Sequence, residues 1–105
     1  MRNSMIVRVW QGVAPKAKLS EHTRYIQEQL LRKCLDAMGN LGALLLSRSR
    51  ADHTEFLLLS FWESASSLEA LTGPEIDGAL GSELINPSTV IKNYEVVVAH
   101  LPNRH

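Results

Sequence analysis

A chain of 105 residues, 45% of them hydrophobic, fits one domain with one core, so we expect a single domain over 1–105 with its core at about 5–100 and tails at 1–4 and 101–105. Acidic and basic residues balance at 11 each, which argues against nucleic acid or an anionic membrane surface as a partner. No run approaches the ~20 apolar residues that span a bilayer, and the first residues lack a secretory signal pattern, so the expected location is the cytoplasm.

Hydrophobic spacing and turn residues predict alternating strands and helices. The first predicted elements are a strand over 5–11 and a helix that ends at Gly39 and Asn40. The apolar face of this helix consists of Leu19, Ile26, Leu30, Cys34 and Met38. Strands over 41–50 and 54–62, a helix from Ser64 to about Thr72, a short helical turn over 76–80 and a strand over 90–100 follow.

The predicted order is β-α-β-β-α-β, with a hairpin in the middle around the polar connection 51–53. Right-handed crossovers then put both helices on the same face of one four-stranded antiparallel sheet. This is an α+β fold of the ferredoxin-like type. Cys34 is the only cysteine, so no internal disulfide forms, and we expect it to be a small apolar residue of the first helix.

Three of the four predicted strands carry apolar residues on both faces, at 44–46, 56–59 and 96–99. Two helices cover only one face of such a sheet. The other face has an area of roughly 400 Å², and leaving it in water forfeits on the order of 10 kcal/mol per chain at about 25 cal/mol per Å². We therefore expect a homodimer in which two sheets pack face to face.

With this order of elements, one stretch becomes recognisable. Residues 55–64 form an apolar strand that ends in Trp-Glu-Ser, and residues 68–73 form a short helix followed by glycine. This pattern resembles the antibiotic biosynthesis monooxygenase (ABM) family of dimeric α/β barrels, and the agreement covers about residues 5–98. The resemblance implies a sheet-to-sheet dimer with a pocket between sheet and helices in each subunit. Some members of the family oxidise polycyclic phenols with oxygen and no cofactor, and others degrade haem.

Three residues near the expected pocket are candidates for binding or catalysis. Trp62 ends the third strand, where the resemblance implies a pocket residue that stacks on a flat ligand; the alternative is a core aromatic that anchors the second helix. His22 lies on the inner stripe of the first helix and could act as an acid or base near neutral pH, or be a buried imidazole with one hydrogen bond. Tyr25 has a polar tip on an apolar body and could assist deprotonation or satisfy local backbone.

Three more residues are candidates for substrate binding. Asn93 and Tyr94 in the last strand could point into the pocket or bond to nearby backbone. Arg48 extends from the second strand and could hold an anionic oxygen, although an arginine of this kind also pairs with a carboxylate at a dimer seam. Trp10 is expected to be a core or seam residue.

We expect no metal and no cofactor. No two histidines stand three or four residues apart, which is the spacing of metal ligands on a helix, and no glycine-rich phosphate loop is present. Haem-degrading relatives rely on an asparagine in the first strand, the strand-end tryptophan and a histidine after the second helix. This chain matches only the tryptophan, because its first strand offers Arg8 and Trp10 and residues 76–82 contain no histidine. Haem degradation is therefore disfavoured.

The leading hypothesis is a cofactor-independent monooxygenase that acts on a small aromatic or quinol-like metabolite. Trp62 would pack on the ligand, and His22 or Tyr25 would assist its deprotonation. A non-catalytic dimeric module that binds a small apolar or aromatic molecule is the alternative from another class, and an isomerase or lyase on the same barrel is a third. Loss of turnover with retained binding on substitution of His22 and Tyr25 distinguishes enzyme from binding module.

Overall fold

The structure is a computed structural model that describes residues 4–72 and 90–100 of the chain. In chain order, the elements are β1 (Ile6–Pro15), the 3₁₀ turn η1 (Lys16–Lys18), α1 (Leu19–Tyr25), the π-helical segment η2 (Ile26–Leu31), α2 (Arg32–Asp36), β2 (Asn40–Ser49), β3 (His53–Trp62), α3 (Ala65–Thr72) and β4 (Val90–Glu95). The predicted α+β order is confirmed, and the helical turn predicted at 76–80 lies outside the described residues.

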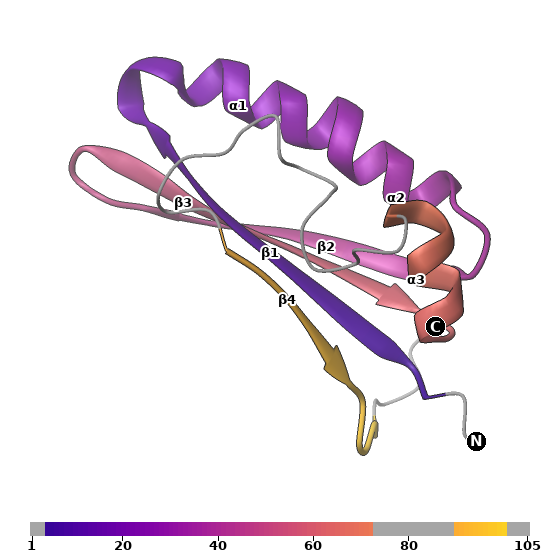
Figure 1. Ribbon diagram of the computed structural model, residues 1–105. Coiled ribbons are helices and arrows are strands. Elements are labelled where there is room, and N and C mark those ends of the chain that lie inside the picture. The colour runs from indigo at the N-terminus through magenta and orange to yellow at the C-terminus, as the bar shows by residue number, and fades with distance from the viewer. Residues whose placement is uncertain (1–3, 73–89, 101–105) are drawn as a thin grey trace, which may run out of the picture.

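The four strands form one antiparallel sheet in the order β2-β3-β1-β4. In Figure 1 the long helical run from η1 to α2 crosses above the sheet, and α3 lies beside the end of β3. Both helical parts therefore belong to one layer, as the ferredoxin-like prediction requires. The central strands β1 and β3 pair over their whole length, from Ile6 opposite Trp62 to Pro15 opposite His53.

β1 is longer and β4 is shorter than the sequence predicts. β1 continues past Gly12 to Pro15, and its described pairing with β4 runs from Ile6 opposite Glu95 to Gln11 opposite Val90. A proline is tolerated at the end of a strand. At the other end, Glu95 pairs with Ile6 at the start of β1, so the prediction of a strand to His100 is wrong beyond Glu95.

The first helical region is one continuous run from Lys16 to Asp36 with a π-helical segment inside it. Ile26, Leu30 and Cys34 each have 1% of their surface exposed and form its buried face, as predicted. Met38 was predicted on the same face but is 92% exposed. The helix has already ended there, because Ala37 takes extended dihedral angles.

Turn chemistry agrees with the predicted boundaries more closely. Gly39 closes the turn with φ of +88°, a conformation that favours glycine. Asn40 instead begins β2, and its amide side chain bonds across the bulge at the start of that strand, accepting from the Gly42 amide at 2.9 Å. Ser64 caps α3 by accepting a hydrogen bond from the Ser67 amide at 3.3 Å, as the sequence predicts.

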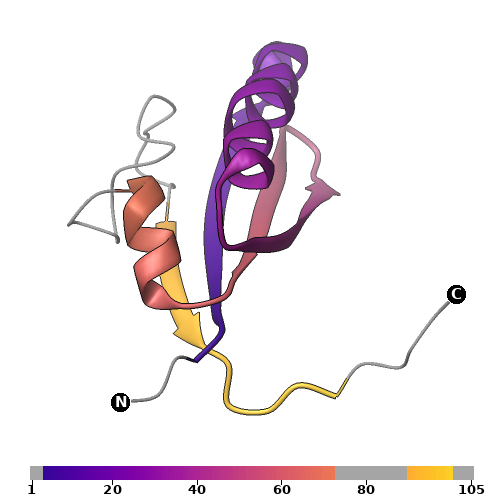
Figure 2. The same cartoon turned by 90° about the vertical axis from the view of Figure 1, so that its right-hand side faces the viewer.

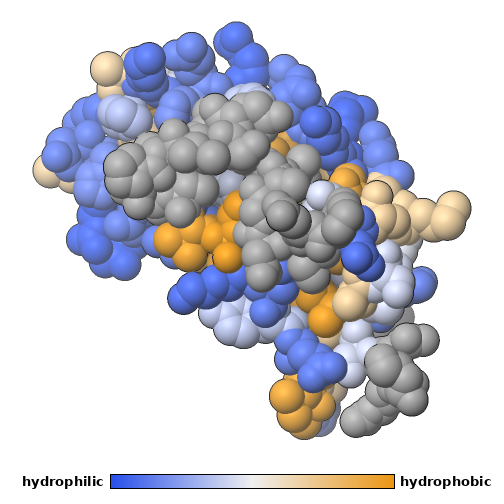
Figure 3. All heavy atoms as spheres, viewed as in Figure 1, coloured by the Kyte–Doolittle hydropathy of each residue, from blue (hydrophilic) through white to orange (hydrophobic). Residues whose placement is uncertain are grey.

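The covered face of the sheet holds the core. Its members alternate along the strands and meet the helical stripe; they are Trp10, Ala14, Ile26, Leu30, Cys34, Phe56, Leu58, Trp62 and Leu68. The outer surface of the helical run is hydrophilic in Figure 3, as an amphipathic helix requires. None of the described helices is long and apolar enough to cross a membrane.

The opposite face, which we call the open face, carries no helix. Leu44, Leu46, Val90 and Tyr94 are 38–52% exposed on it, and Val7, Val9, Leu57, Leu59 and Phe61 are partly buried there by parity. Figure 2 shows residues 96–100 leaving the end of β4 and running away from the sheet. Val97 and Val98 in that segment are 90% and 81% exposed.

Candidate functional site

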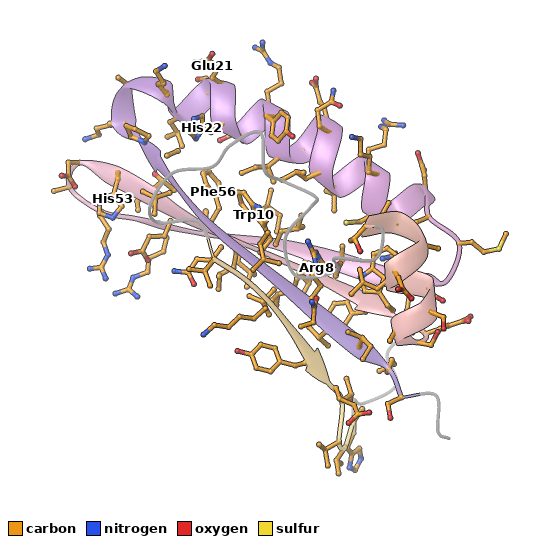
Figure 4. The ribbon with its side chains drawn as sticks, in the orientation of Figure 1. Arg8, Trp10, Glu21, His22, His53 and Phe56 are labelled. Atoms are coloured by element: carbon orange, nitrogen blue, oxygen red, sulfur yellow. The ribbon has the colours of Figure 1, made fainter. Side chains whose placement is uncertain are left out.

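A small cavity lies inside the covered face, between the two central strands and the helical run. It has a volume of about 10 Å³, which is room for about one water molecule. Its described lining consists of Arg8, Trp10, Leu30, Cys34, Leu58 and Ser60. Figure 4 shows Arg8 and Trp10 side by side beneath the helix, both rising from β1.

The spacing of these residues explains why they meet. Arg8 and Trp10 are two apart in β1, as are Leu58 and Ser60 in β3, so each pair points to the same side of the sheet. Trp10 and Leu58 are direct partners across the strands, and Arg8 and Ser60 are the next pair on that face. The helical run completes the cavity with Leu30 and Cys34, which are four residues apart and so share one face.

Polar groups surround the cavity although it lies in the core. Arg8 has only 3% of its surface exposed, and its Nη1 donates to Asn93 Oδ1 at 3.4 Å. Trp62 Nε1 donates to Ser60 Oγ at 2.9 Å. Nε1 of Trp10 is buried and meets no acceptor in the part of the chain that the structure describes. An indole N–H so placed normally finds a partner.

Cys34 adds a thiol rather than a thiolate to this cavity. Burial raises the pKa of Cys34 above its ordinary value of 9.0, while a hydrogen bond from Ser60 and the charge of Arg8 act in the opposite direction and do not overcome it. Near neutral pH the side chain is therefore protonated. Among the described residues that line the cavity, Arg8 is the one with a charged side chain.

Gly12 fixes the position of the Trp10 indole. A Cβ added at Gly12 would lie 2.5 Å from Cη2 of Trp10 and 2.9 Å from its Cζ3. The six-membered ring therefore lies across the glycine backbone, which only a residue without a side chain permits. A side chain at position 12 would therefore displace the indole.

The structure places the predicted residues of the covered face unequally around the cavity. Trp62 is fully buried and lies behind Ser60, to which it donates. Asn93 lies on β4 and contacts the cavity through Arg8. His22 and Tyr25 are partly buried on α1. In Figure 4 His22 lies on the side of the helix toward the sheet, and Glu21 points away.

The positions of His22 and Tyr25 along the helix show how far each lies from the cavity. His22 precedes Leu30 by eight residues and Tyr25 precedes it by five. At 1.5 Å of rise per residue these offsets are roughly 12 Å and roughly 7.5 Å along the helix. Neither side chain lines the cavity itself. A ligand that touches both the cavity and His22 must therefore be elongated.

Arg48 and Tyr94 lie on the open face, away from the cavity. Arg48 pairs across the strands with Glu55 and lines a shallow hollow of about 140 Å³ with Leu46 and Leu57. Tyr94 is 52% exposed opposite Val7. Within one protomer these two residues do not share a pocket with Trp62, because side chains alternate between the faces of a strand and both fall on the wrong parity.

Sequence reasoning did not single out Arg8 and Ser60. Arg8 stands two residues before Trp10, so strand parity alone puts it on whichever face Trp10 occupies. Ser60 stands in the same relation to Trp62. The signal available in the sequence was a charged residue two positions from a core tryptophan on the same strand.

The described lining of the cavity does not fit a haem group. Histidine and thiolate are the protein ligands that would bind haem iron here, and the described lining of the cavity contains no histidine. Its one cysteine is held as a thiol by burial. Among the described residues no three His, Cys, Asp or Glu side chains cluster in a way that could hold a metal ion.

Comparison with known proteins identifies the fold. No protein-family model matches the sequence, and no curated protein matches it. Among solved structures, a haem-degrading protein from Mycobacterium tuberculosis is 17% identical with a TM-score of 0.67, over 96% of this chain and 100% of that one. A Caulobacter crescentus protein assigned to the antibiotic biosynthesis monooxygenases is 20% identical with a TM-score of 0.68, over 91% and 92% of the two chains.

A third match is a monooxygenase from Streptomyces coelicolor, solved in complex with nanaomycin D, at 15% identity and a TM-score of 0.56 over 96% of this chain and 94% of that one. The resemblance of the sequence to ABM proteins is thus confirmed in the fold. All three identities are below 25%, and one fold hosts many activities, so the activity must be argued from the site.

Proposed function

We propose that this protein is a homodimeric, cofactor-independent monooxygenase that oxidises an elongated aromatic phenol or quinol. The observation that carries the proposal is the cavity of the covered face, which lies in the core and is lined by the buried Arg8 and by Trp10, whose buried Nε1 has no acceptor among the described residues. Fixed donors in a water-excluded site stabilise a developing or existing oxyanion. Structures of the same fold include monooxygenases.

The reaction balances without an added reductant. Loss of the phenolic proton gives an electron-rich anion, which transfers electrons to oxygen and forms a carbon–oxygen bond at the ring. The resulting hydroperoxide loses water, so one oxygen atom remains as a new carbonyl and the other leaves as water. All four electrons come from the substrate, which becomes a quinone. The protein has only to desolvate, orient and deprotonate the substrate.

His22 and Tyr25 are the residues proposed to assist deprotonation. The cavity as it stands admits one atom of oxygen's size, so the aromatic ring would lie along the helix and displace side chains of the η2 segment. π-Helical turns are rare and often occur at functional sites, and η2 supplies Leu30 to the cavity. Trp62 would act from behind Ser60, and Asn93 would hold Arg8 in place.

Oxygen consumption in the presence of a panel of naphthalene and anthracene quinols tests this proposal. We expect the wild-type protein to accelerate consumption above the spontaneous rate, and His22→Gln or Tyr25→Phe to slow it by about 10²–10⁴-fold for the residue that acts as the base. Glu21→Gln, next to His22 but facing solvent, is the matched control. Consumption no faster with protein than without it, across the panel, contradicts the proposal.

A non-catalytic binding module uses the same cavity, since buried donors also bind a ligand that never reacts. Ligand affinity measured alongside turnover separates the two. Quinol binding that is kept in His22→Gln and Tyr25→Phe while turnover falls favours the enzyme. Binding without turnover in the wild-type protein favours the module.

The dimer is proposed from the open face. Apolar side chains from all four strands lie on this face. Its area is roughly 400 Å² at ordinary strand spacings. A second copy is the occupant that matches it, because an identical flat apolar sheet buries both faces about a two-fold axis and the formal net charge of zero raises no repulsion between copies. Sedimentation of the wild-type protein as a monomer at micromolar concentration would contradict it.

A further inference from the structure

We propose that the cavity of the covered face is a subsite for one neutral acceptor oxygen, held by the indole N–H of Trp10. An internal water supplies this oxygen in the free protein, and the carbonyl or hydroxyl oxygen of a flat ligand supplies it in the complex. The subsite deepens the proposed function, on which it rests for the identity of the ligand. The burial of the indole, the polar atoms around it and the size of the space each support it.

The first observation is the indole N–H of Trp10. The residue has 4% of its surface exposed, and its Nε1 is buried without an acceptor in the described part of the chain. A buried N–H that lacks an acceptor loses the hydrogen bond it makes to water in the unfolded chain, so native proteins nearly always satisfy it with a protein group or an ordered water. Trp62 shows the usual arrangement, since its Nε1 donates to Ser60 Oγ at 2.9 Å. The two buried indoles differ in the one respect that an acceptor oxygen would correct.

The charge of Arg8 has no part in holding this oxygen. Arg8 lines the same cavity, but it has interactions of its own, and one of them is the bond from its Nη1 to Asn93 Oδ1 at 3.4 Å. An indole N–H needs an acceptor and not a negative charge. The subsite therefore selects an acceptor atom, and a neutral ligand satisfies it.

Two further polar atoms can bond to a water beside Trp10. Ser60 Oγ accepts from Trp62, and a hydroxyl oxygen has a second lone pair. Cys34 is a neutral thiol because burial raises its pKa, and its sulfur is a weak acceptor. Ser60 and Cys34 line the cavity together with Trp10. A water that accepts from Nε1 and donates to these two residues makes three hydrogen bonds, which is typical of a buried water.

The size of the cavity limits what else enters it. A volume of about 10 Å³ holds one water, or one oxygen atom of a larger molecule, and does not hold a ring. The ring of a ligand would therefore lie outside, along η2, with its oxygen in the cavity. A ring without such an oxygen would leave the water in place and gain nothing from Trp10. The subsite thus distinguishes ligands by whether a small acceptor stands at the edge of a flat ring.

A matched pair of neutral probes tests the subsite. 1-Indanone and indane share a flat bicyclic frame and differ in one carbonyl oxygen. Crystal structures of the wild-type protein, alone and with 1-indanone, distinguish the two sources of the oxygen. We expect a water within about 3 Å of Trp10 Nε1 in the free protein and the carbonyl oxygen in its place in the complex. Calorimetry measures the affinity of each probe.

We expect 1-indanone to bind more tightly than indane, and Trp10→Phe to weaken the binding of 1-indanone by about three- to tenfold with little change for indane. Phenylalanine keeps an aromatic ring and removes the N–H, so the response of indane reports on packing alone. Tyr94→Phe is the matched control, because it removes an O–H from an aromatic ring on the open face. This variant should bind both probes like wild type.

Wild-type protein with neither a water nor a ligand oxygen beside Nε1 overturns the subsite. Equal binding of the two probes, binding of neither, or an equal loss for both in Trp10→Phe also overturns it. A water that stays beside Nε1 at saturating 1-indanone rejects the ligand as a source of the oxygen. If Trp10→Phe fails to fold, the two crystal structures and the wild-type affinities decide. Turnover is a separate outcome: a preference for 1-indanone without oxygen consumption keeps the subsite and rejects the monooxygenase, and oxygen consumption without the preference does the reverse.

Discussion

The two faces of the sheet are made of alternate residues of the same strands and have opposite surroundings. Along β3, Phe56, Leu58 and Trp62 are buried under the helices, whereas Leu57, Leu59 and Phe61 between them are only partly covered. Both sets are strongly apolar, so hydrophobicity does not distinguish the faces. The polar residues do. The covered face encloses Arg8 and Ser60, whereas the charged residues of the open face are Arg48 and Glu55 near the hairpin and the exposed Lys92 on β4.

This difference is the reason for proposing a different partner for each face. A flat, largely apolar face whose polar residues are exposed suits a second copy of itself better than a small ligand. A core that tolerates a charge and an indole N–H without a described acceptor gives up stability, and such sites are where function is expected. Substitutions matched between the two faces therefore test the division.

The largest effect is expected from a charge placed on the open face. Leu44→Glu would bury a carboxylate in the proposed dimer seam at a cost of several kcal/mol, so the dimer should dissociate by about a thousandfold more readily. Leu35→Glu is the matched control, because Leu35 and Leu44 are both 51% exposed and Leu35 lies on α2. Sedimentation equilibrium measures both. An equal response of the two variants would contradict the special role of the open face.

Two neighbouring leucines of β3 test the two faces within a single monomer. In the Leu44→Glu background, Leu58→Ala should lower the free energy of unfolding by about 2–5 kcal/mol, because it empties packed volume in the core. Leu57→Ala, one residue earlier and on the open face, should cost less than about 1 kcal/mol. Urea denaturation gives both values. Similar losses would mean that both faces are already buried within one chain.

Gly12→Ala tests the packing that positions Trp10. The new methyl group would meet the indole at 2.5 Å, so the ring must shift, at a cost of about 1–3 kcal/mol. The fluorescence spectrum of Trp10 should change with it. The same substitution in a Trp10→Ala background should cost less, since the clash is gone. A cost that is equal in both backgrounds would show that the indole does not depend on Gly12.

The smallest effect is expected from pH. Burial raises the pKa of Cys34 in the folded protein, while the unfolded chain keeps the ordinary value of 9.0. The folded state then holds the thiol proton more tightly, so this contribution to stability is fully present below pH 9.0 and is lost as the pH rises from there through the raised pKa of the folded state. Above pH 9.0 the urea midpoint of wild type should therefore fall more than that of Cys34→Ala. Parallel curves for the two proteins would place Cys34 in contact with water.

The sequence predicts the element types well because they follow from local periodicity and turn chemistry. The helical stripe through Ile26, Leu30 and Cys34, and the cap at Ser64, depend on neighbours a few residues away. The errors fall where a distant partner decides. β4 stops at Glu95 because β1 begins at Ile6, and Met38 is exposed because Ala37 leaves the helix.

The candidate site was harder to predict for the same reason. Trp62 and Asn93 do lie next to the cavity, because each is hydrogen-bonded to a residue that lines it. Trp62 donates to Ser60, and Asn93 accepts from Arg8. Arg48 and Tyr94 lie on the open face by strand parity, which for Arg48 is the side of the alternative role at a dimer seam. The cavity needs residues from β1, β3 and the helix at once. Only the register of the strands brings Arg8 and Ser60 together, and no local pattern encodes that register.

The most direct test of two faces with two partners is anaerobic native mass spectrometry of the wild-type protein in the presence of 1,4-dihydroxynaphthalene, with 1,4-dimethoxynaphthalene as the control that lacks the hydroxyl groups. We expect a dimer that carries up to two molecules of the quinol, one for each covered face, and much less of the dimethoxy compound. A monomer would contradict the role proposed for the open face, and a dimer that carries neither compound or both equally would contradict the role proposed for the covered face.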